Sequence, residues 1–493
     1  MPMRRWWERA RLVPGAPSVR GLEVSAEEWL QSAGDAAAAG GRLLALWVSR
    51  EPRESQTALV YGAYLTDVGV LINELPVDIT EDGRTYPGLE GLFPAASRLQ
   101  RAAHDLSDVR SSDPDRRPWL NHAEPYAFVR VEGEGVHEIP VGPVHAGTIE
   151  PGHFRFSVVG EKVLKLEERL GYTHKGIERR FAQLPLLEGH RLAARVSGDS
   201  AVAFSWAYCQ ALEGMAGCEI PARAAWLRAA FLELERVANH LSDLGALGND
   251  AGFAFGLTQF SRLKEQLLRA LQASTGQRYL LDAVVPGGTN VDVPARAAAA
   301  LAETVRAVCA EAVELRGIYD EHAGVRDRFI GTGRLAPELA ARLGVLGLAG
   351  RASGQPLDAR VDFPCAPYAE IAPAKVVRTE GDVAARVSVR FDELAESGRL
   401  LERILTELPS GAHVAVPVEP AAGAFGAGLI EGWRGPVLVA LEAGSRGAIR
   451  RCHPHDPSWQ NWPAIEYAIL GNLVPDFPLI NKSFNLSYSG ADL

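Results

Sequence analysis

Apolar residues recur every three or four positions along three long stretches in the second half of the chain. Leu227, Leu234 and Leu241 belong to the first stretch, and residues 301–318 and 383–408 repeat the spacing. This period places the apolar side chains on one face of an amphipathic helix. The sequence therefore predicts three long helices that each bury one side, the last of them ending before Pro409.

Shorter apolar runs, bounded by Gly, Pro and polar residues, indicate β-strands instead. They are concentrated in the first 150 residues and reappear as a hairpin pattern near the C-terminus. The pattern predicts an α+β protein: a small N-terminal α/β module fused to a large, mainly α-helical domain with a β-rich start and a short β-hairpin near the C-terminus. Strands are expected at residues 42–48, 57–64, 68–72, 126–131, 135–141, 436–442 and 447–451, and short helices at 27–32 and 98–106.

Proline positions divide the chain into parts. Pro114, Pro118 and Pro125 mark a linker, so we expect a module at residues 20–120 and a large domain at 126–493. Residues 1–19 form a basic N-terminal segment in which four arginines surround Trp6 and Trp7. Such a segment is either a solvated tail, the simpler interpretation, or a contact for lipid headgroups or an acidic partner.

Composition and charge narrow the class of protein. The 493 residues are 47% hydrophobic and carry a net charge of −10, which is typical of a folded protein and argues against nucleic-acid binding. No apolar run is long enough to cross a bilayer, and the start lacks the features of a secretory signal. The five cysteines are scattered singly, which favours reduced thiols in a cytoplasmic protein.

Several segments carry candidate chemistry. His145 and His153 lie in a Gly- and Pro-rich stretch, and we expect hydrogen-bonded loop histidines that face a cavity rather than metal ligands. His453 and His455 lie in a polar stretch and are expected to be exposed. Residues 421–428 (AAGAFGAG) are predicted to be a flexible loop. They contain no dinucleotide-binding fingerprint, because no strand leads into them and Pro and Gly surround them.

Dispersed motifs between residue 126 and the C-terminus carry a family resemblance. They are Gly142-Pro143-Val144-His145-Ala146-Gly147, Leu170-Gly171-Tyr172, His174-Lys175-Gly176-Ile177-Glu178, Ala207-Tyr208-Cys209-Gln210-Ala211-Leu212-Glu213, Pro286-Gly287-Gly288 and Gly381-Asp382-Val383. In these motifs the chain resembles the large subunit of membrane-bound energy-converting [NiFe] hydrogenases, as in formate hydrogenlyase, and the homologous 49-kDa subunit of respiratory complex I. Residues 86–119, with Tyr-Pro, Phe-Pro-Ala-Ala, a helix and an Asp/Arg loop, resemble the 30-kDa subunit of complex I.

The nickel-ligating cysteines of that family are replaced in this chain. The resemblance places the four ligand positions at Ser197, Ser200, Ser487 and Gly490. A nickel–iron centre needs anionic sulfur, whereas a serine hydroxyl stays protonated near neutral pH. We therefore expect no cofactor bound directly, and in particular no Ni-Fe centre. A harder metal held by Asp199, His153 and Asp250 is a weaker alternative.

The resemblance to the 49-kDa subunit also implies a quinone pocket. Its loop histidine matches His153, or alternatively His145, and its aspartate matches Asp250. The family's tyrosine falls on Gly198, which removes one hydrogen-bond donor to a quinone. We expect Asp250 and His153 to form a proton-passing pair, with Glu178 as a buried carboxylate of raised pKa on the proton path. Further residues expected to line the pocket are His145, Arg195, Asp199 and Ser487, with Arg360 as a candidate cavity residue; for both arginines, surface ion pairs are the alternative.

These expectations define one function and one alternative. The resemblance implies a peripheral large subunit of a membrane-bound complex I-like or hydrogenase-4-like oxidoreductase that binds quinone or another small acceptor without activating hydrogen. Its partners would be a small subunit with an iron-sulfur cluster and antiporter-like membrane subunits, on the cytoplasmic, inner face of the cell membrane. NAD binding belongs to the larger complex. The alternative is a redox-inactive scaffold or transducer with a close-packed apolar cavity.

Overall fold

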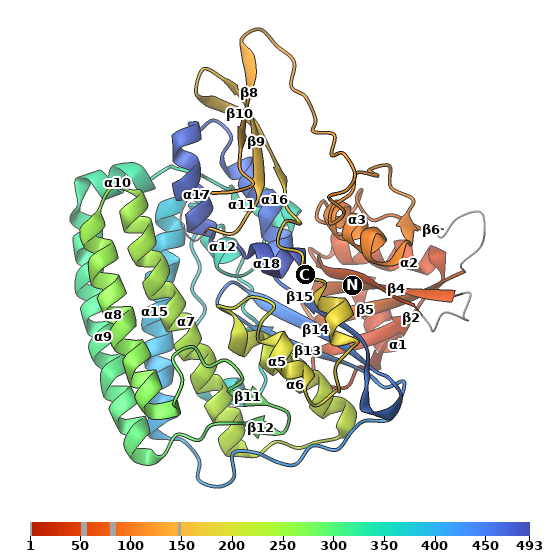
Figure 1. The fold of residues 1–493 in the computed structure, drawn as a ribbon, viewed down its shortest axis with the longest axis vertical. Coiled ribbons are helices and arrows are strands. Elements are labelled where there is room, and N and C mark those ends of the chain that lie inside the picture. The colour runs from red at the N-terminus through yellow and green to blue at the C-terminus, as the bar shows by residue number, and fades with distance from the viewer. Residues whose placement is uncertain (1, 51–56, 79–84, 146–148) are drawn as a thin grey trace.

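The computed structural model describes residues 2–50, 57–78, 85–145 and 149–493. Its N-terminal part is built on a five-stranded sheet (Figure 1). Its order is β1-β2-β5-β4-β3, with β2 and β5 parallel and the other pairs antiparallel. This sheet and its helices occupy most of residues 20–120. The strands are β1 (Arg11–Leu12), β2 (Val19–Glu23), β3 (Arg42–Arg50), β4 (Thr57–Thr66) and β5 (Gly69–Asp78).

Both faces of this sheet are buried, because apolar residues occupy successive positions of the central strands. Helices α2 (Ala26–Ala38) and α3 (Ala96–Ser107) cover one face. On the other face, Trp47 stacks between Tyr61 and His453, with ring centroids 4.8 and 4.9 Å apart. Because His453 belongs to the C-terminal sheet, the N-terminal module is fastened directly to the end of the chain.

The C-terminal sheet has three strands and forms the platform under the large domain. Its strands β13 (Phe425–Glu431), β14 (Pro436–Ala443) and β15 (Ile449–His455) are antiparallel, and helix α6 (Ala201–Ala216) packs on β13 and β14. The chain then ends in α16 (Ser458–Ala468), α17 (Phe477–Phe484) and α18 (Tyr488–Asp492). A third sheet, β8 (Val136–Val141), β9 (His153–Val159) and β10 (Lys162–Arg169), projects from the body of the molecule (Figure 1).

Four long helices lie side by side on the flank opposite the N-terminal module (Figure 1). They are α7 (Ala222–Asp250), α8 (Ala254–Thr275), α9 (Ala295–Glu321) and α15 (Val383–Thr406). The prediction of three long helices is confirmed by α7, α9 and α15. The remaining elements are α1 (Pro2–Arg9), β6 (Thr85–Tyr86), β7 (Arg110–Ser111), α4 (Ile177–Phe181), α5 (Gly189–Ala193), β11 (Val284–Val285), β12 (Gly288–Thr289), α10 (Ala323–Phe329), α11 (Pro337–Leu343), α12 (Gly347–Ala352), α13 (Ala359–Asp362), α14 (Tyr368–Ile371), η1 (Ser445–Gly447) and η2 (Val474–Asp476).

Helices α7 and α15 meet through a buried seam of charged side chains. Glu393 of α15 lies 3.0 Å from Nε2 of His240 and accepts a hydrogen bond from Nε of Arg351 at 2.8 Å. One helical turn away, Arg390 donates to Asp243 at 2.9 Å. These side chains are almost completely removed from solvent, so each charge depends on its neighbours for compensation.

Three local predictions are wrong. Residues 126–131 contain no strand, because this described stretch makes no ladder with the neighbouring sheet. The stretch 421–428 is not all loop, since Phe425 begins β13 and gives the predicted hairpin a third strand. The N-terminal segment is not a solvated tail: α1 buries Trp6, whose Nε1 donates to Asp35 of α2 at 2.7 Å.

Breaking this seam of buried charges should lower the free energy of unfolding. Glu393→Gln removes the charge that faces Arg351, and breaking a buried pair typically lowers the free energy of unfolding by about 3–5 kcal/mol. The matched control is Glu402→Gln on the exposed face of the same helix, where the ion pair with Arg306 contributes within about 0.5 kcal/mol. Urea unfolding of the purified chain measures both, and equal effects would contradict a structural role for the seam.

Candidate functional site

Two segments almost 300 residues apart in sequence meet at one point of the large domain. Oγ of Ser197, in the turn before α6, lies 2.8 Å from Oγ of Ser487, which caps α18. The backbone N–H of Gly490 donates to the same Ser487 hydroxyl at 2.9 Å. The two motif halves therefore face one another as the sequence predicts, joined by hydroxyl hydrogen bonds.

The other two positions that the resemblance assigns to metal ligands, Ser200 and Gly490, also carry no thiolate. A guanidinium nitrogen of Arg434 donates to Oγ of Ser200 at 3.3 Å. At Gly490, an added Cβ would lie 2.7 Å from Oδ2 of Asp456, so the aspartate fills the space that a side chain would need. Burial raises the pKa of Asp456, partly offset by Arg434. The four positions present hydroxyl groups, a guanidinium and a backbone N–H, none of which is a soft anionic ligand.

Arg434 is the central cation of this junction. Its guanidinium makes a two-point ion pair with Asp199, at 2.6 Å from each carboxylate oxygen, and Nε donates to the carbonyl of Asn485 at 2.6 Å. The group lies 4.0 Å from the ring centroid of Trp433. Desolvation alone would raise the pKa of Asp199, but Arg434 outweighs it and holds that pKa below its usual value. The pair is therefore charged near neutral pH.

A cavity of about 490 Å³ opens beside this junction. Its wall mixes apolar side chains with groups that donate, accept and carry charge, which is the composition of a small-molecule site. The polar lining comprises His145, Glu150, Ser197, Asp199, Asp250, Arg434, Asn481, Lys482, Asn485, Ser487, Tyr488 and Ser489.

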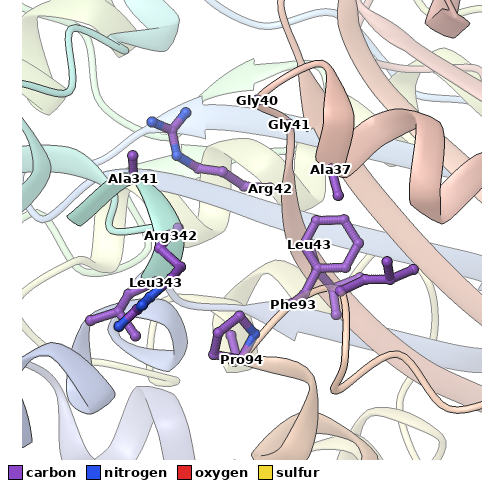
Figure 2. A pocket seen from close by; sticks show the side chains of 13 residues that line it. Ala37, Gly40, Gly41, Arg42, Leu43, Phe93, Pro94, Ala341, Arg342 and Leu343 are labelled. Carbon is purple, nitrogen blue, oxygen red and sulfur yellow. The ribbon is translucent and has the colours of Figure 1, made fainter. Parts of the chain in front are cut away.

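A second cavity, of about 310 Å³, lies at the junction between the N-terminal sheet and α11. Figure 2 shows Arg42 reaching from β3 towards Ala341, with Phe93 and Pro94 on the opposite side. Its described lining residues include no carboxylate, imidazole, thiol or hydroxyl side chain. No side chain in this second cavity can support acid–base chemistry. The candidate site is therefore the first cavity, which is lined by Ser197, Ser487 and Ser489 and which we call the serine-lined cavity.

The structure separates the two histidines that the sequence singles out. His145 lines the cavity, and its Nε2 lies 2.8 Å from the carbonyl of Gly152. The ring of His153 packs against Phe128 instead, and its Nδ1 faces the carbonyl of Gly142 at 3.4 Å. Burial lowers the pKa of His153. Ala146 and Gly147 of the motif lie outside the described residues.

Asp250, the last residue of α7, lines the cavity as expected. Burial raises the pKa of Asp250, while Lys482 on α17 acts in the opposite direction. The expected pair with Asp250 is not formed, because Nδ1 of His153 faces the Gly142 carbonyl and its Nε2 has no hydrogen-bond partner among the described residues. The proposed metal set of Asp199, His153 and Asp250 is likewise not assembled; the described chain contains no cluster of three such side chains arranged to hold a metal.

Glu178 is buried, but its ionisation differs from the expectation. Its carboxylate lies 2.6 Å from Nδ1 of His453 and accepts from Arg451 at 2.6 Å. Burial would raise the pKa of Glu178, yet Arg451 and His453 outweigh burial and lower it. The expected raised pKa is wrong for this reason. His453 and His455 are buried rather than exposed, because they belong to strand β15.

The two arginines expected near the cavity lie elsewhere. Arg195 forms a two-point surface ion pair with Asp282, at 2.6 and 2.8 Å. Arg360 is buried between Glu233 and Asp358, within the charged region that adjoins the seam. Among the lining groups that the sequence analysis did not propose, Asn485 lies two residues before Ser487 in the tail motif. Arg434 and Lys482 belong to no motif, so no sequence signal indicated them.

Comparison with known proteins gives this geometry a context. Residues 250–425 match the family model of the respiratory-chain NADH dehydrogenase 49 Kd subunit. Formate hydrogenlyase subunit 5 of Escherichia coli is 31% identical over 386 residues, 78% of this chain and 68% of that protein. Hydrogenase-4 component G of the same organism is 31% identical over 371 residues, 75% of this chain and 64% of its own length.

A solved structure shares the fold. A chain in the structure of the membrane-bound sulfane sulfur reductase, an archaeal respiratory membrane complex, superposes with a TM-score of 0.68 at 24% identity. The match covers 73% of this chain and 99% of that chain. The α+β fold predicted from the sequence is confirmed. No helix among the described residues is long and apolar enough to cross a membrane.

Restoring a side chain at Gly490 should destabilise the protein. Alanine is the better helix former, so a loss in Gly490→Ala reports the clash with Asp456. We expect a loss of about 1–3 kcal/mol in the free energy of unfolding, reduced to under about 1 kcal/mol when Asp456→Ser makes room. Gly198→Ala is the control, since its Cβ meets no atom within 4 Å. A loss that persists in the double variant would contradict this account.

The pairing of Glu178 should give a defined pH dependence. Because the pKa of Glu178 is lowered in the folded state, its contribution is present above the unfolded-state value of 4.5 and is lost as the pH falls through the folded-state pKa. Glu178→Gln should therefore be less stable than the wild type at pH 7, and the gap should narrow as the pH falls below 4.5. Urea unfolding across this range tests it, with exposed Glu188→Gln as the control. A gap independent of pH would contradict the assignment.

Proposed function

Because the chain belongs to the family that unites formate hydrogenlyase-type hydrogenase large subunits with the 49-kDa subunit of respiratory-chain NADH dehydrogenase, we propose that it is the peripheral large subunit of a membrane-bound, complex I-like oxidoreductase. Its serine-lined cavity binds a small electron acceptor, with quinone as the leading candidate. Family membership supports the assembly, and the cavity supports the binding role. The observation that carries the proposal is a polar cavity of about 490 Å³ at the meeting point of the two motif halves.

The donor set at this meeting point does not fit a nickel–iron centre. Ser197 and Ser487 bond to one another, and Ser200 accepts from Arg434. Asp456 occupies the space that a side chain at Gly490 would enter. Reactions through such a centre are therefore not part of the proposal, and hydrogen turnover is not expected.

The lining residues supply what reduction of an acceptor requires. A two-electron reduction of a quinone takes up two protons at its oxygens, so the site needs hydrogen-bond donors and a proton-holding group. Lys482, Asn485 and Tyr488 are donors at the wall, and Asp250 is a carboxyl group whose pKa is raised by burial. In this scheme Asp250 delivers one of the two protons to an acceptor oxygen, solvent supplies the other, and Lys482 stabilises the carboxylate left behind.

The partners follow from the same proposal. Electrons would arrive from an iron-sulfur cluster in a neighbouring small subunit, and antiporter-like membrane subunits would anchor the assembly at the inner face of the cell membrane. The family relation to formate hydrogenlyase subunit 5 and hydrogenase-4 component G supports this arrangement. NAD would bind elsewhere in such a complex. The resemblance of residues 20–120 to the 30-kDa subunit belongs to the proposal as well.

A scaffold without redox chemistry is the alternative function. It requires a close-packed, apolar filling between the two motif halves. The locked pair of Arg434 and Asp199 fits a structural role, but the open and polar wall beside it favours binding.

An assay of the intact membrane complex tests the proposed site. Asp250→Asn removes the proton-holding group and should lower quinone reduction about tenfold or more, with unchanged assembly. Asp320→Asn, at an exposed position of α9, is the control and should leave the rate unchanged. Neither complex should evolve or consume hydrogen. Full activity in Asp250→Asn, or hydrogen turnover in the wild type, would contradict the proposal.

A further inference from the structure

A smaller cavity of about 140 Å³ lies on the other side of the serine-bearing turn. Its wall is formed by the facing sides of α7 and α8 together with residues 278–280. Its aliphatic lining residues are Leu234, Ala238, Leu268, Leu271 and Leu280, and the other lining residues are Gly198, Asp199, Glu235, Asn239, Lys264, Arg278 and Tyr279. A cavity of roughly 150 Å³ with aliphatic walls is large enough to hold a molecule such as benzene. We call this space the side cavity.

Gly198 and Asp199 are lining residues of both cavities. The turn that carries Ser197 is thus shared between the polar site and the side cavity. A Cβ placed at Gly198 would meet no atom within 4 Å, so the backbone is bare here and faces open space. A bulky side chain at this position would extend into that open space, whereas glycine leaves it free.

The polar groups of the side cavity favour an uncharged ligand. Glu235 accepts from the backbone N–H groups of Val202 and Ala203 at the start of α6, and burial raises the pKa of Glu235 to about 8. Lys264 donates to Ser242 at 3.1 Å, and burial lowers its pKa. Both shifts favour the neutral forms. The two remaining charged groups of the wall are paired: Arg278 with Glu265, and Asp199 with Arg434.

We propose that the side cavity is a second subsite, which holds an uncharged apolar group of the ligand whose polar end occupies the serine-lined cavity, the two parts joining across Gly198. The ligand class is an amphipathic acceptor with a polar ring and an alkyl or prenyl substituent. This inference rests on the proposed function for the identity of the polar end. It goes beyond that function because it assigns Ala238, Leu268 and Leu271 to ligand selection.

The test compares two ligands that differ only in the apolar group. The probes are 2-methyl-1,4-naphthoquinone and the same compound with one prenyl unit at carbon 3, titrated into the purified full chain by calorimetry. Ala238→Leu fills the side cavity and leaves the serine-lined cavity intact. It should weaken binding of the prenylated probe roughly tenfold, the equivalent of about two methylene groups removed from an apolar site, and leave the unsubstituted probe unchanged.

Ala273→Leu, at an exposed position of α8, is the matched control and should change neither affinity. Equal affinities of wild type and Ala238→Leu for the prenylated probe would overturn the inference, as would equal weakening of both probes. Gly198→Tyr provides a second variant that closes the join between the cavities, and it should also discriminate against the prenylated probe.

Benzene separates this inference from the proposed function. If neither naphthoquinone binds the wild type, the proposed acceptor is wrong. Benzene binding then tests separately whether the side cavity holds an apolar molecule. Saturable benzene binding to the wild type, detected by ligand NMR and lost in Ala238→Leu, supports an apolar subsite. Absence of benzene binding to the wild type overturns it.

Discussion

The two-point ion pair between Arg434 and Asp199 holds the two halves of the site together. Asp199 belongs to the turn before α6, and Arg434 lies between β13 and β14. Nε of the same arginine also donates a hydrogen bond to the carbonyl of Asn485 in the C-terminal tail. A single guanidinium therefore connects three segments that are distant in sequence. The four positions to which the sequence resemblance assigns thiolate ligands lie on the first and last of these segments.

This replacement has a simple electrostatic logic. A metal held by thiolates places positive charge at the centre of a ring of negative ligands. Here the positive charge is a guanidinium, the negative charge is the carboxylate of Asp199, and neutral hydroxyls occupy three of the four ligand positions. Bidentate charge-assisted bonds are stronger than neutral hydrogen bonds and have a fixed geometry. The junction can thus keep its shape while the neighbouring cavity remains open.

Sequence patterns predict the helices with strong apolar periodicity. They do not predict site residues or pKa shifts that depend on contacts between distant segments. The long helices α7, α9 and α15 follow from apolar spacing, and the meeting of Ser197 with Ser487 follows from the motifs. Arg434 could not be found, since an isolated arginine between two strands has no local signature. The ionisation of Glu178 was misjudged because its partners Arg451 and His453 lie on a strand 270 residues away in sequence. Burial alone predicted the wrong sign.

The packing of α7 against α15 and the C-terminal tail determines one side of the serine-lined cavity. Asp250 ends α7, whose inner face carries the seam with α15, so the rigid helix fixes the carboxylate at one side of the cavity. Asp243, one residue of that seam, accepts from Asn485 of the tail at 2.6 Å. The hydrogen bond from Asn485 thus connects the buried charges of the helix pair to the cavity wall. Because each of these charges is compensated by a neighbour on another element, a shift of the tail would disturb the seam, and a shift of the seam would move Asp250. The position of the ligand-facing groups is therefore set by the packing of α7, α15 and the tail as one unit.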